Sequence, residues 1–567
     1  MPGEWKQRHP IADPTVVWVP HLTPAEGNVV GDWVFRSPAV IVAGQSRAIA
    51  YIPDLDDVAN ITAKGGQVWL DYDHPAREIT VAVGKYRHDG HVFFVRDGEI
   101  SDASVRVHVL DSDRPEDIAN PYGLAARFFW DRWGRTRMQR KQLTPYVEHA
   151  LRWAFSSKGW SDSVWQVVDE KMAAPVFIVD VGCHPSVPRE RRTWREPRSI
   201  WNQAWFSTQR CANGLHRQGH RVDAKKMTEI ALAAPMHDGL FPSVLLADDD
   251  GKWRWTNSDR RPPSVSADAC HVVDAAFTCR MLREWHSLTG DTRALDRAKA
   301  FAARMIREQR PNGSFPGWIE PDGRIPSALA ELPEGPESAV TATLLFELGE
   351  TEAAMRAIPF LEECARQGRW EDFETYYSCA PWGTPGERVP RNGVFKQNTL
   401  SIAWCAEAFL CAGRLDLARR CIDELSLYQA VWDPPFLPAF AHGGFGVMNA
   451  DAEWNDARQS LFAPLYLELG QAMDDRELVE RGVSAMRASF NMMYCPQNPA
   501  LQDAYEARFP FFGPESWGFM MENQGHDPAT PIGGFTIFSW GPGSAIAALA
   551  DICARFPEIA REHGLDE

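Results

Sequence analysis

Residues 440–459, FAHGGFGVMNADAEWNDARQ, gather a histidine, amides, carboxylates and a tryptophan in one short stretch. The glycine-rich part, residues 442–446, lets another molecule approach the backbone closely, because glycine has no side chain. The end, residues 453–456, stands directly before an apolar run that predicts a buried helix. Rings that stack on pyranose faces, with carboxylates and amides that bind hydroxyls, are what a sugar-binding site needs. The alternative is that Asn455 or Asp456 only caps the helix.

A second polar cluster occupies residues 521–527, MENQGHD, which hold two acids, two amides and a histidine. A solvated loop would have this composition too, but the tryptophans that flank it favour a loop buried in a site. The candidate catalytic residues of the two clusters are His442, Asp456, Glu522 and His526. The candidate substrate-binding residues of the two clusters are Trp454, Asn455, Arg458, Trp517 and Asn523.

Glycoside hydrolysis is the first chemistry that these residues could perform, because it needs one protonated and one ionised carboxyl group. Asp456 could pair with Glu522, or with Glu337 from an earlier part of the chain. A carboxyl separation of about 5–5.5 Å gives retention and one of about 6.5–9.5 Å gives inversion. Desolvation beside tryptophan would raise a carboxyl pKa, as a general acid requires.

Two other functions stay open. A lyase would abstract the proton next to a neutralised carboxylate, and Tyr377, His442 or His526 could be the base. A non-catalytic carbohydrate-binding protein would use the same polar groups without turnover. A uronic-acid-containing oligosaccharide is the preferred substrate, because Arg391, Lys396 and Arg458 could pair with a sugar carboxylate.

Composition narrows the classes of function further. The chain has 567 residues, too many for one ordinary core, and 23 tryptophans, an excess that favours a ligand with flat apolar faces. A formal net charge of −17 argues against a nucleic-acid partner, because phosphates favour a basic surface.

Cysteine use and hydropathy bear on metals and location. The 11 cysteines include no CxxC pair and no Cys/His cluster at zinc spacing, so we expect neither a metal nor another cofactor. The chain shows no signal peptide and no apolar run of about 18 residues, so we expect a cytoplasmic protein without a membrane partner. A homo-oligomer stays open.

The elements that must position these residues fall into two kinds. Between about residues 15 and 110, short β-branched runs alternate with turns, which predicts an antiparallel β-sandwich domain over residues 1–120. Segments such as 16–19, 32–35 and 47–52 are among its expected strands. Residues 121–199 then predict a linking helix, which begins at Thr144-Pro145, and a hairpin.

From residue 200 to residue 567 the pattern is helical, in pairs separated by short glycine-marked turns. The pairs are 200–217 with 224–234, 267–288 with 293–310, 337–348 with 352–367, 398–412 with 415–427, and 456–469 with 475–490, and 543–555 belongs to a sixth. Long loops between the pairs hold most of the Trp, Pro and Gly. Short loops on one side and long loops on the other predict an (α/α)6 toroid, with function on the long-loop face.

Residues that open the inner helices of such a toroid should point into its pocket. This criterion adds Asp268 and Glu337 to the candidate catalytic residues, although both could serve only as helix caps or favourable charges at a helix N-terminus. It adds Asn398 as a substrate-binding amide. The long loop that follows the third pair contributes Tyr377 and the aromatic Trp382.

This organisation resembles the six-hairpin glycosidase superfamily and the polysaccharide lyases that share its toroid. Residues 312–318, NGSFPGW, resemble the turn that follows the second hairpin in many of these enzymes. The resemblance covers roughly residues 201–557 and, in outline, the sandwich. It implies a carbohydrate-active enzyme. No catalytic motif of the family matches residue by residue, so no catalytic position is carried over from it.

Overall fold

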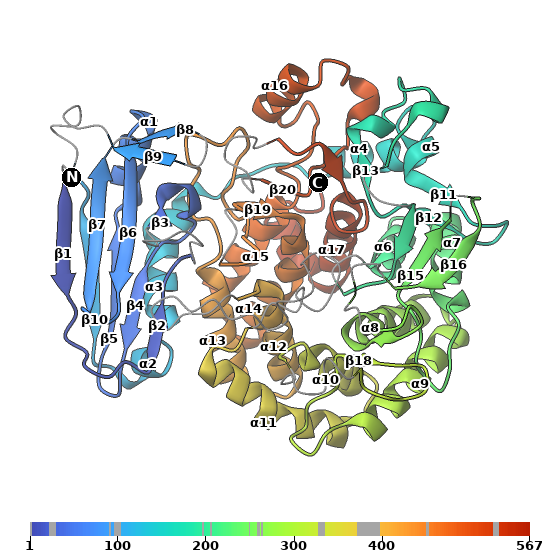
Figure 1. The fold of residues 1–567 in the computed structure, drawn as a ribbon, viewed down its shortest axis with the longest axis horizontal. Coiled ribbons are helices and arrows are strands. Elements are labelled where there is room, and N and C mark those ends of the chain that lie inside the picture. Colours follow the sequence, from blue (N-terminus) through green and yellow to red (C-terminus); the bar gives the residue numbers. More distant parts are fainter. Residues whose placement is uncertain are drawn as a thin grey trace.

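The structure is a computed structural model and describes most of the chain. The described residues are 3–21, 30–84, 86–89, 92–95, 104–194, 198–204, 207–248, 250–257, 261, 265–326, 335–370, 397–449, 453–524 and 532–567. Figure 1 shows β-sheets at one end of the molecule, drawn in blue, and a ring of helices that fills the rest.

The N-terminal part contains two small antiparallel sheets of four strands each. The first has the order β1 (Glu4–Arg8), β7 (Glu78–Gly84), β6 (Gln67–Asp73) and β3 (Val30–Gly31). The second has the order β10 (Val107–Ser112), β5 (Ala48–Pro53), β4 (Val40–Ala43) and β2 (Val16–Trp18). Trp5 of β1 and Tyr51 of β5 have ring centroids 6.4 Å apart, so the two sheets are in contact through their side chains.

One predicted strand of this region is wrong. Residues 32–35 were expected to be extended, but Asp32–Val34 form a 3-10 turn, η1. The buried Asp32 carboxylate accepts hydrogen bonds from Thr62 Oγ1 (2.9 Å) and from the Val68 backbone (3.1 Å), which hold the turn against β6. A helix that the sequence analysis missed, α1 (Leu55–Ala63), begins where Asp54 caps the backbone of Asp56 and Asp57.

The helical part is built from paired inner and outer helices. The inner helices are α6 (Thr208–Arg217), α8 (Val272–Thr289), α10 (Ser338–Glu347), α12 (Thr399–Cys411), α14 (Phe462–Met473) and α17 (Pro542–Arg555). Their outer partners are α7 (Arg221–Ala233), α9 (Thr292–Glu308), α11 (Thr351–Gln367), α13 (Leu415–Ser426), α15 (Arg476–Ala488) and the short α18 (Pro557–Glu562). The five predicted pairs and the final inner helix are therefore present.

The inner helices close into a ring. Each packs against the next in chain order, and α17 packs back against α6 (Figure 1). Gly214 of α6 faces Ala547 of α17 so closely that an added Cβ would lie 2.5 Å from the Ala547 Cα. Only glycine fits at this contact. The prediction of an (α/α)6 arrangement is confirmed by this closed ring.

The turns within the pairs use left-handed residues, as predicted for most of them. Gly290, Gly349 and Gly413 have positive φ after α8, α10 and α12. The fifth turn differs from the prediction: α14 continues through Gly470, and Asp474 takes the left-handed conformation instead (φ 53°). Gly470 is needed for a different reason, because a Cβ there would lie 2.9 Å from Val479 of α15.

Residues 121–199 pack against both the N-terminal sheets and the ring of helices. Helix α3 (Pro121–Phe129) lies on β4, β5 and α13, and α4 (Thr144–Phe155), which begins at the predicted residue, packs against α17. Trp130 donates to the Glu480 carboxylate of α15 (2.9 Å), and Arg481 donates to the Ala126 carbonyl (2.6 Å). These bonds fasten the region beside the sheets to the fifth hairpin.

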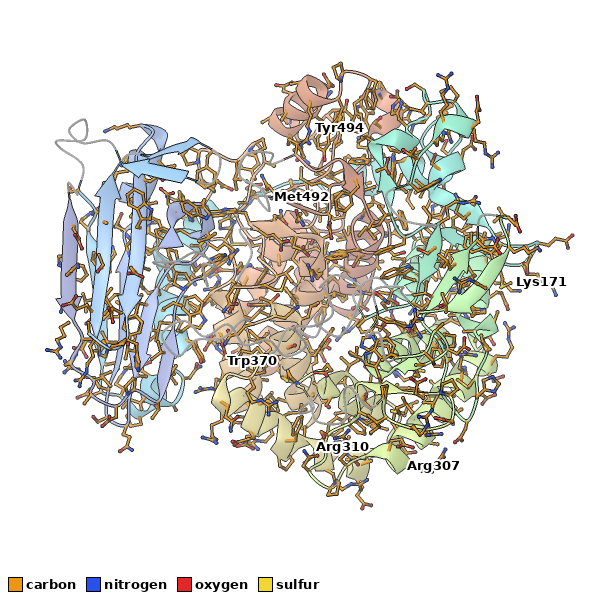
Figure 2. The ribbon with its side chains drawn as sticks, viewed as in Figure 1. Lys171, Arg307, Arg310, Trp370, Met492 and Tyr494 are labelled. Atoms are coloured by element: carbon orange, nitrogen blue, oxygen red, sulfur yellow. The ribbon has the colours of Figure 1, made fainter. Side chains whose placement is uncertain are left out.

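Figure 2 shows how densely side chains fill the helical part. Trp370 is labelled in its interior, 1% exposed, with its indole N–H on the buried Glu424 carboxylate (2.9 Å). Lys171, by contrast, projects from the far edge into solvent (Figure 2). None of the helices within the described ranges combines the length and apolar character that a membrane span requires.

Candidate functional site

The long-loop face of the ring carries short strand pairs ahead of the inner helices. They are β13 (Val179–Asp180) with β21 (Phe535–Thr536), β14 (Ser199–Trp201) with β15 (Val244–Ala247) and β16 (Trp253–Thr256), β17 (Cys270–His271) with β18 (Trp318–Ile319), and β19 (Asn455–Asp456) with β20 (Asn523–Gln524). Three inner helices, α6, α8 and α14, therefore begin five or more residues later than predicted. We call this face, from these strands to the first turns of the inner helices, the mouth of the ring.

Asp456 lies in a cluster of polar groups at the mouth that are hydrogen-bonded to one another. It is fully buried and caps the 3-10 turn η8 (Ala457–Leu461) through the Arg458 backbone N–H (2.8 Å). Arg458 Nε and Trp540 Nε1 donate to the same carboxylate oxygen, at 2.9 Å and 3.2 Å. Burial raises the pKa of Asp456 to about 6, and the Arg458 guanidinium limits the rise. The predicted capping role is present, and the tryptophan beside the acid is Trp540.

The pairing of β19 with β20 brings the two sequence clusters together. Asp456 is opposite Asn523 in the register, and the Ala457 N–H donates to the Glu522 carbonyl (3.1 Å). Asn523 Nδ2 donates to Glu453 Oε1 (3.1 Å), so a further acid joins the group. Glu453 is 2% exposed, whereas the Glu522 side chain is only partly buried. Four sequence-predicted residues, Asp456, Arg458, Glu522 and Asn523, thus share one place.

A second cluster at the mouth was not predicted. His271 Nδ1 lies 2.7 Å from Asp274 Oδ2, and the imidazole stacks on Trp318 with centroids 4.3 Å apart. Asp274 is completely buried and also accepts from the Ala204 N–H (3.1 Å). A carboxylate that orients an imidazole is a common arrangement for a base. The sequence signal was the His-x-x-Asp spacing at the start of α8.

Glu337 belongs to this second cluster. It immediately precedes α10, where the helix N-terminus favours a carboxylate. Its Oε1 lies 3.8 Å from where a Cβ on Gly317 would stand, and the Gly317 carbonyl accepts from the Val272 N–H (2.9 Å). Glu337 therefore lies beside the chain segments that carry His271 and Trp318.

Two buried amides of the mouth lack hydrogen-bond partners among the described residues. Asn202 and Gln203, between β14 and α6, are 3% and 0% exposed, and no oxygen or nitrogen of either side chain has a hydrogen-bond partner in the part of the chain that the structure describes. Thr341 in the first turn of α10 is buried with its hydroxyl unpaired as well. Buried polar groups are almost always paired, so groups left without protein partners indicate a place for a polar ligand.

Two amides that were predicted to bind substrate form hydrogen bonds with backbone groups instead. Asn398 caps α12 through the Leu400 N–H (2.9 Å), as its position predicted. Asn455 Nδ2 donates to the Ala488 carbonyl at the end of α15 (3.1 Å). Both side chains are completely buried at the mouth, and each fixes the start of an inner helix or the end of an outer one.

Four predicted site residues do not contribute to these clusters: His442, Trp454, Trp517 and Asp268. His442 is buried between Gly134 and Ser484, with a hydrogen-bond contact at each ring nitrogen (2.9 and 3.1 Å), and burial lowers its pKa. Trp454 is fully buried against Trp432 and donates to the Trp33 carbonyl, so it cannot be an open stacking platform.

Trp517 and Asp268 also differ from expectation. Trp517 packs beside His149 and Arg152 of α4, with ring centroids of Trp517 and His149 5.4 Å apart. Asp268 is exposed in a turn ahead of β17 and does not cap α8, whose preceding residue is His271. The sequence pattern placed the helix start too early, and that is why Asp268 looked like a mouth residue.

Three candidate residues lie outside the described residues: Tyr377, Trp382 and His526. The same is true of Arg391 and Lys396, which supported the uronic-acid preference. Within the ranges that the structure describes, no group of three or more His, Cys, Asp and Glu side chains is arranged to hold a metal ion.

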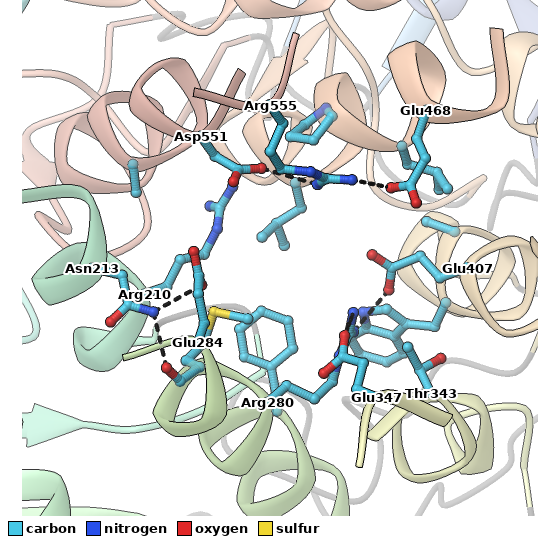
Figure 3. A pocket seen from close by; sticks show the side chains of 18 of the residues that line it. Arg210, Asn213, Arg280, Glu284, Thr343, Glu347, Glu407, Glu468, Asp551 and Arg555 are labelled. Carbon is cyan, nitrogen blue, oxygen red and sulfur yellow. Dashed lines mark hydrogen bonds and ion pairs between the residues drawn. The ribbon is translucent and has the colours of Figure 1, made fainter. Parts of the chain in front are cut away.

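A cavity of about 440 Å³ runs along the ring axis toward the opposite end. Figure 3 shows its charged side chains, which come from the inner helices. Arg280 Nη1 contacts Glu407 (2.9 Å) and Arg280 Nη2 contacts Glu347 (3.0 Å), while Arg555 bridges Asp551 and Glu468. Burial alone would lower the pKa of Arg280, but the two glutamates raise it. These charged groups form ion pairs with one another, and the ion pairs join neighbouring helices.

Comparisons with known proteins bear on the fold. No family model matches the sequence, and no curated protein matches it. Solved structures are similar at low identity. A cellobiose 2-epimerase from Bacillus thermoamylovorans is 10% identical, with 72% of this chain and 99% of that chain covered and a TM-score of 0.43.

Two further structures are similar at the same level. The α-mannanase of glycoside hydrolase family 76 from Bacteroides thetaiotaomicron is 11% identical, with coverages of 74% and 98% and a TM-score of 0.43. A D-mannose isomerase is also 11% identical, with coverages of 72% and 97% and a TM-score of 0.43. At these values the similarities assign no activity to this chain. The six paired inner helices, closed by the contact of α17 with α6, are themselves the six-hairpin arrangement that the sequence resembled.

Proposed function

We propose that the chain is a carbohydrate-active enzyme that acts on an oligosaccharide at the mouth of the ring. The observation that carries this proposal is the pair of buried, unpartnered amides, Asn202 and Gln203. An amide offers a donor and an acceptor side by side, which suits the neighbouring hydroxyls of a sugar. Leaving such groups unpaired costs about 1–3 kcal/mol each, so their retention supports a binding role.

Glycoside hydrolysis is the reaction that the side chains support best. Four carboxyl groups gather at the mouth: Glu337, Glu453, Asp456 and Glu522. Glu453 and Asp456 are buried, and donors occupy the Asp456 carboxylate. Glu337 and Glu522 are partly exposed, so we assign them as the carboxyl groups that contact the substrate. Asp456 then acts as a positioning residue that holds Arg458 and the β19–β20 pair.

A second candidate rests on the His271–Asp274 pair. An imidazole oriented by a buried carboxylate could remove a proton from a sugar carbon, as a lyase requires. His271 then takes the role that the sequence analysis gave to His442. A uronic-acid substrate has no support from Arg458, because Asp456 already neutralises its charge.

Product analysis tests the proposal. Wild-type protein is incubated with defined oligosaccharides, and products are followed by mass and by ultraviolet absorbance. Hydrolysis adds one water to the products, whereas elimination leaves an unsaturated chromophore and no added water. Loss of hydrolysis in Glu522→Gln, in a folded protein, supports the assignment. Turnover of no saccharide would contradict an enzymatic function and favour a binding protein.

A further inference from the structure

A cavity of about 730 Å³ lies outside the cluster that the proposed reaction uses. One wall is the segment between η3 (Arg135–Arg137) and α4, and another is the loop that precedes β19. The lining residues are Ala59, Arg137, Gln139, Arg140, Lys141, Tyr146, Trp432, Asp433, Phe440, Gln497 and Asn498. All of them are described residues, and the volume falls in the range typical of small-molecule sites.

Cations in and beside this cavity are held by neutral groups. Lys141 Nζ donates to the Asn491 side-chain oxygen and lies 4.6 Å from the centroid of the Tyr146 ring. Arg487 of α15 is 6% exposed and donates to the carbonyls of Gln139 and His563, and its Nε has no partner. Neither cation has a carboxylate within ion-pair distance among the described residues.

Arg140 completes the set. It is exposed, lines the cavity and forms no ion pair with a described residue. Burial lowers the pKa of Arg487, and the neighbouring Arg140 lowers it further, so the two guanidiniums are close enough to repel. The chain carries a net charge of −17, so three adjacent cations that form no ion pair with a described residue are unusual here.

The other charged groups of the cavity do not cancel this excess. Arg137 is already paired with Asp56 (2.6 Å). Asp433, the one acid of the lining, receives the N–H groups of Ala441 and His442 at 2.7 and 2.9 Å. Its carboxylate holds the loop and keeps its negative charge, but the lining together with Arg487 contains more cations than acids, so the local field remains positive.

Aromatic rings shape the rest of the cavity. Phe440 is 57% exposed, which is high for a large apolar side chain, while Trp432 and Tyr146 are buried in the walls. An exposed ring beside cations suits a ligand that has both an apolar face and a negative charge. A pyranose that carries an acidic group has these two properties.

We propose that this cavity binds an oxyanion, a carboxylate or a phosphate, carried by a sugar-sized ligand. Lys141, Arg140 and Arg487 supply the positive charge, and Phe440 supplies the stacking face. The cavity adjoins the mouth, because Gln524 of β20 donates to the Ala439 carbonyl (3.1 Å), next to Phe440. The proposal concerns binding alone and does not depend on which reaction the mouth performs.

Calorimetric titration of the full chain tests it, with glucuronate, glucose 6-phosphate and neutral glucose as probes. Either charged sugar should bind, and glucose should bind at least about tenfold more weakly, because charge-assisted hydrogen bonds are worth more than neutral ones. Binding of glucuronate alone identifies a carboxylate site, and binding of glucose 6-phosphate alone identifies a phosphate site. Equal binding of glucose, or no binding of either anion, would overturn the proposal.

Variants distinguish a binding role of these cations from a purely structural role. Lys141→Met and Arg140→Gln should each weaken binding of the charged probe at least about tenfold. Lys158→Met, an exposed lysine outside the cavity lining, is the matched control and should leave it unchanged. The melting temperature of unliganded Lys141→Met at pH 6 should equal or exceed that of wild type, because a buried charge without an anion is removed. Unchanged affinity in both cavity variants would contradict the assignment.

Proton uptake gives an independent readout. The pKa of Lys141 is lowered to about 7, mainly by burial, which Cys495 opposes and Arg487 supports. Tyr146, Arg137, Arg140 and Asp433 are the other titratable or charged groups that line the cavity. A bound anion favours the charged ammonium, so binding at pH 8 should take up a proton, seen as a dependence of the binding enthalpy on buffer ionisation. A wild-type enthalpy that is the same in all buffers at pH 8 would contradict the role of Lys141. Failure of the hydrolase proposal would leave these binding results unaffected, and the reverse also holds.

Discussion

Asp456 and Arg458 form a buried ion pair two residues apart, with Nε and Oδ1 separated by 2.9 Å. The Arg458 guanidinium also lies over the Trp540 ring, 4.3 Å from its centroid, so the pair joins the start of the fifth inner helix to the chain ahead of the sixth. An acid with this many partners is well placed to hold the mouth together. This is why we separate the role of Asp456 from that of Glu522.

The pH dependence of stability should report the buried state of Asp456. Its folded pKa of about 6 lies above the unfolded value of about 3.9. The proton that the folded state retains therefore stabilises it fully below pH ~3.9, and this stabilisation is lost as pH rises through about 6. The free energy of unfolding of wild type relative to Asp456→Asn should fall by roughly 2 kcal/mol between pH 4 and pH 7, at about 1.4 kcal/mol per pKa unit with part of the change already complete at pH 4.

Denaturant unfolding of both proteins across this range measures the difference. Asn is a good cap as well, so the variant should fold. A difference that does not change with pH would show that Asp456 titrates normally.

Removal of the cation should be costly. Arg458→Gln leaves the Asp456 carboxylate buried without its counter-charge, and breaking a buried pair in this way costs about 3–5 kcal/mol. The loss should be smaller at pH 5 than at pH 7.5, because the isolated carboxyl group then takes up a proton. Arg324→Gln, which removes an exposed arginine paired with Asp322, should change stability by less than about 1 kcal/mol. Equal losses in the two variants would contradict a buried ion pair.

Replacing an unpaired amide by an apolar side chain should preserve or raise stability but weaken substrate binding. Gln203→Leu removes a buried polar group without partners, so the free energy of unfolding should stay the same or rise. The same change should lower kcat/KM for an oligosaccharide at least about tenfold. Gln209→Leu is the matched control, because Gln209 Nε2 donates to Asn213 (3.0 Å) and Thr228 (3.1 Å), and its loss should destabilise the protein. A Gln203→Leu protein that is destabilised and fully active would contradict a binding role.

The ion pairs of the axial cavity should matter for stability and not for turnover. Arg217 bridges Glu284 and Asp551, which lie on the neighbouring helices α8 and α17. Arg217→Gln should lower the melting temperature, more at low than at high salt, because screening weakens the pairs that it removes. Its kcat/KM per folded molecule should stay within about twofold of wild type. A large loss of turnover in a stable Arg217→Gln protein would move the active site to this end of the ring.

The helical pairs could be predicted from the sequence because each pair has its own apolar periodicity and its own glycine turn. Gly290, Gly349 and Gly413 mark their turns unambiguously, since each needs a positive φ. Gly470 misled the prediction: it is glycine for close packing against Val479, and Asp474 makes the turn. Sequence alone does not distinguish these two uses of glycine.

The mouth was only partly predictable, for a related reason. Asp456, Glu522 and Asn523 meet through β19 and β20, two-residue strands that have no periodicity to detect. His271 was passed over because the helix was expected to begin at residue 267, which placed His271 and Asp274 within it and not at its N-terminus. Trp454 and His442 were chosen for residue type. In the structure, Trp454 is hydrogen-bonded to the Trp33 carbonyl and His442 to the Gly134 carbonyl, so neither side chain is available to a ligand. Residue type and spacing identify candidates, and long-range contacts decide which remain available.

The most direct test of the account compares Glu522→Gln with Asp456→Asn on the same oligosaccharide. Both changes replace a carboxyl group by an amide of equal size, and both variants should fold. Glu522→Gln should lower kcat at least about a hundredfold, the lower end of general acid–base contributions. Asp456→Asn should retain kcat within about tenfold, because the amide oxygen can still accept from Trp540 and the Arg458 backbone. A Glu522→Gln protein with near-normal kcat, beside an inactive Asp456→Asn, would contradict the assignment and make Asp456 the catalytic acid.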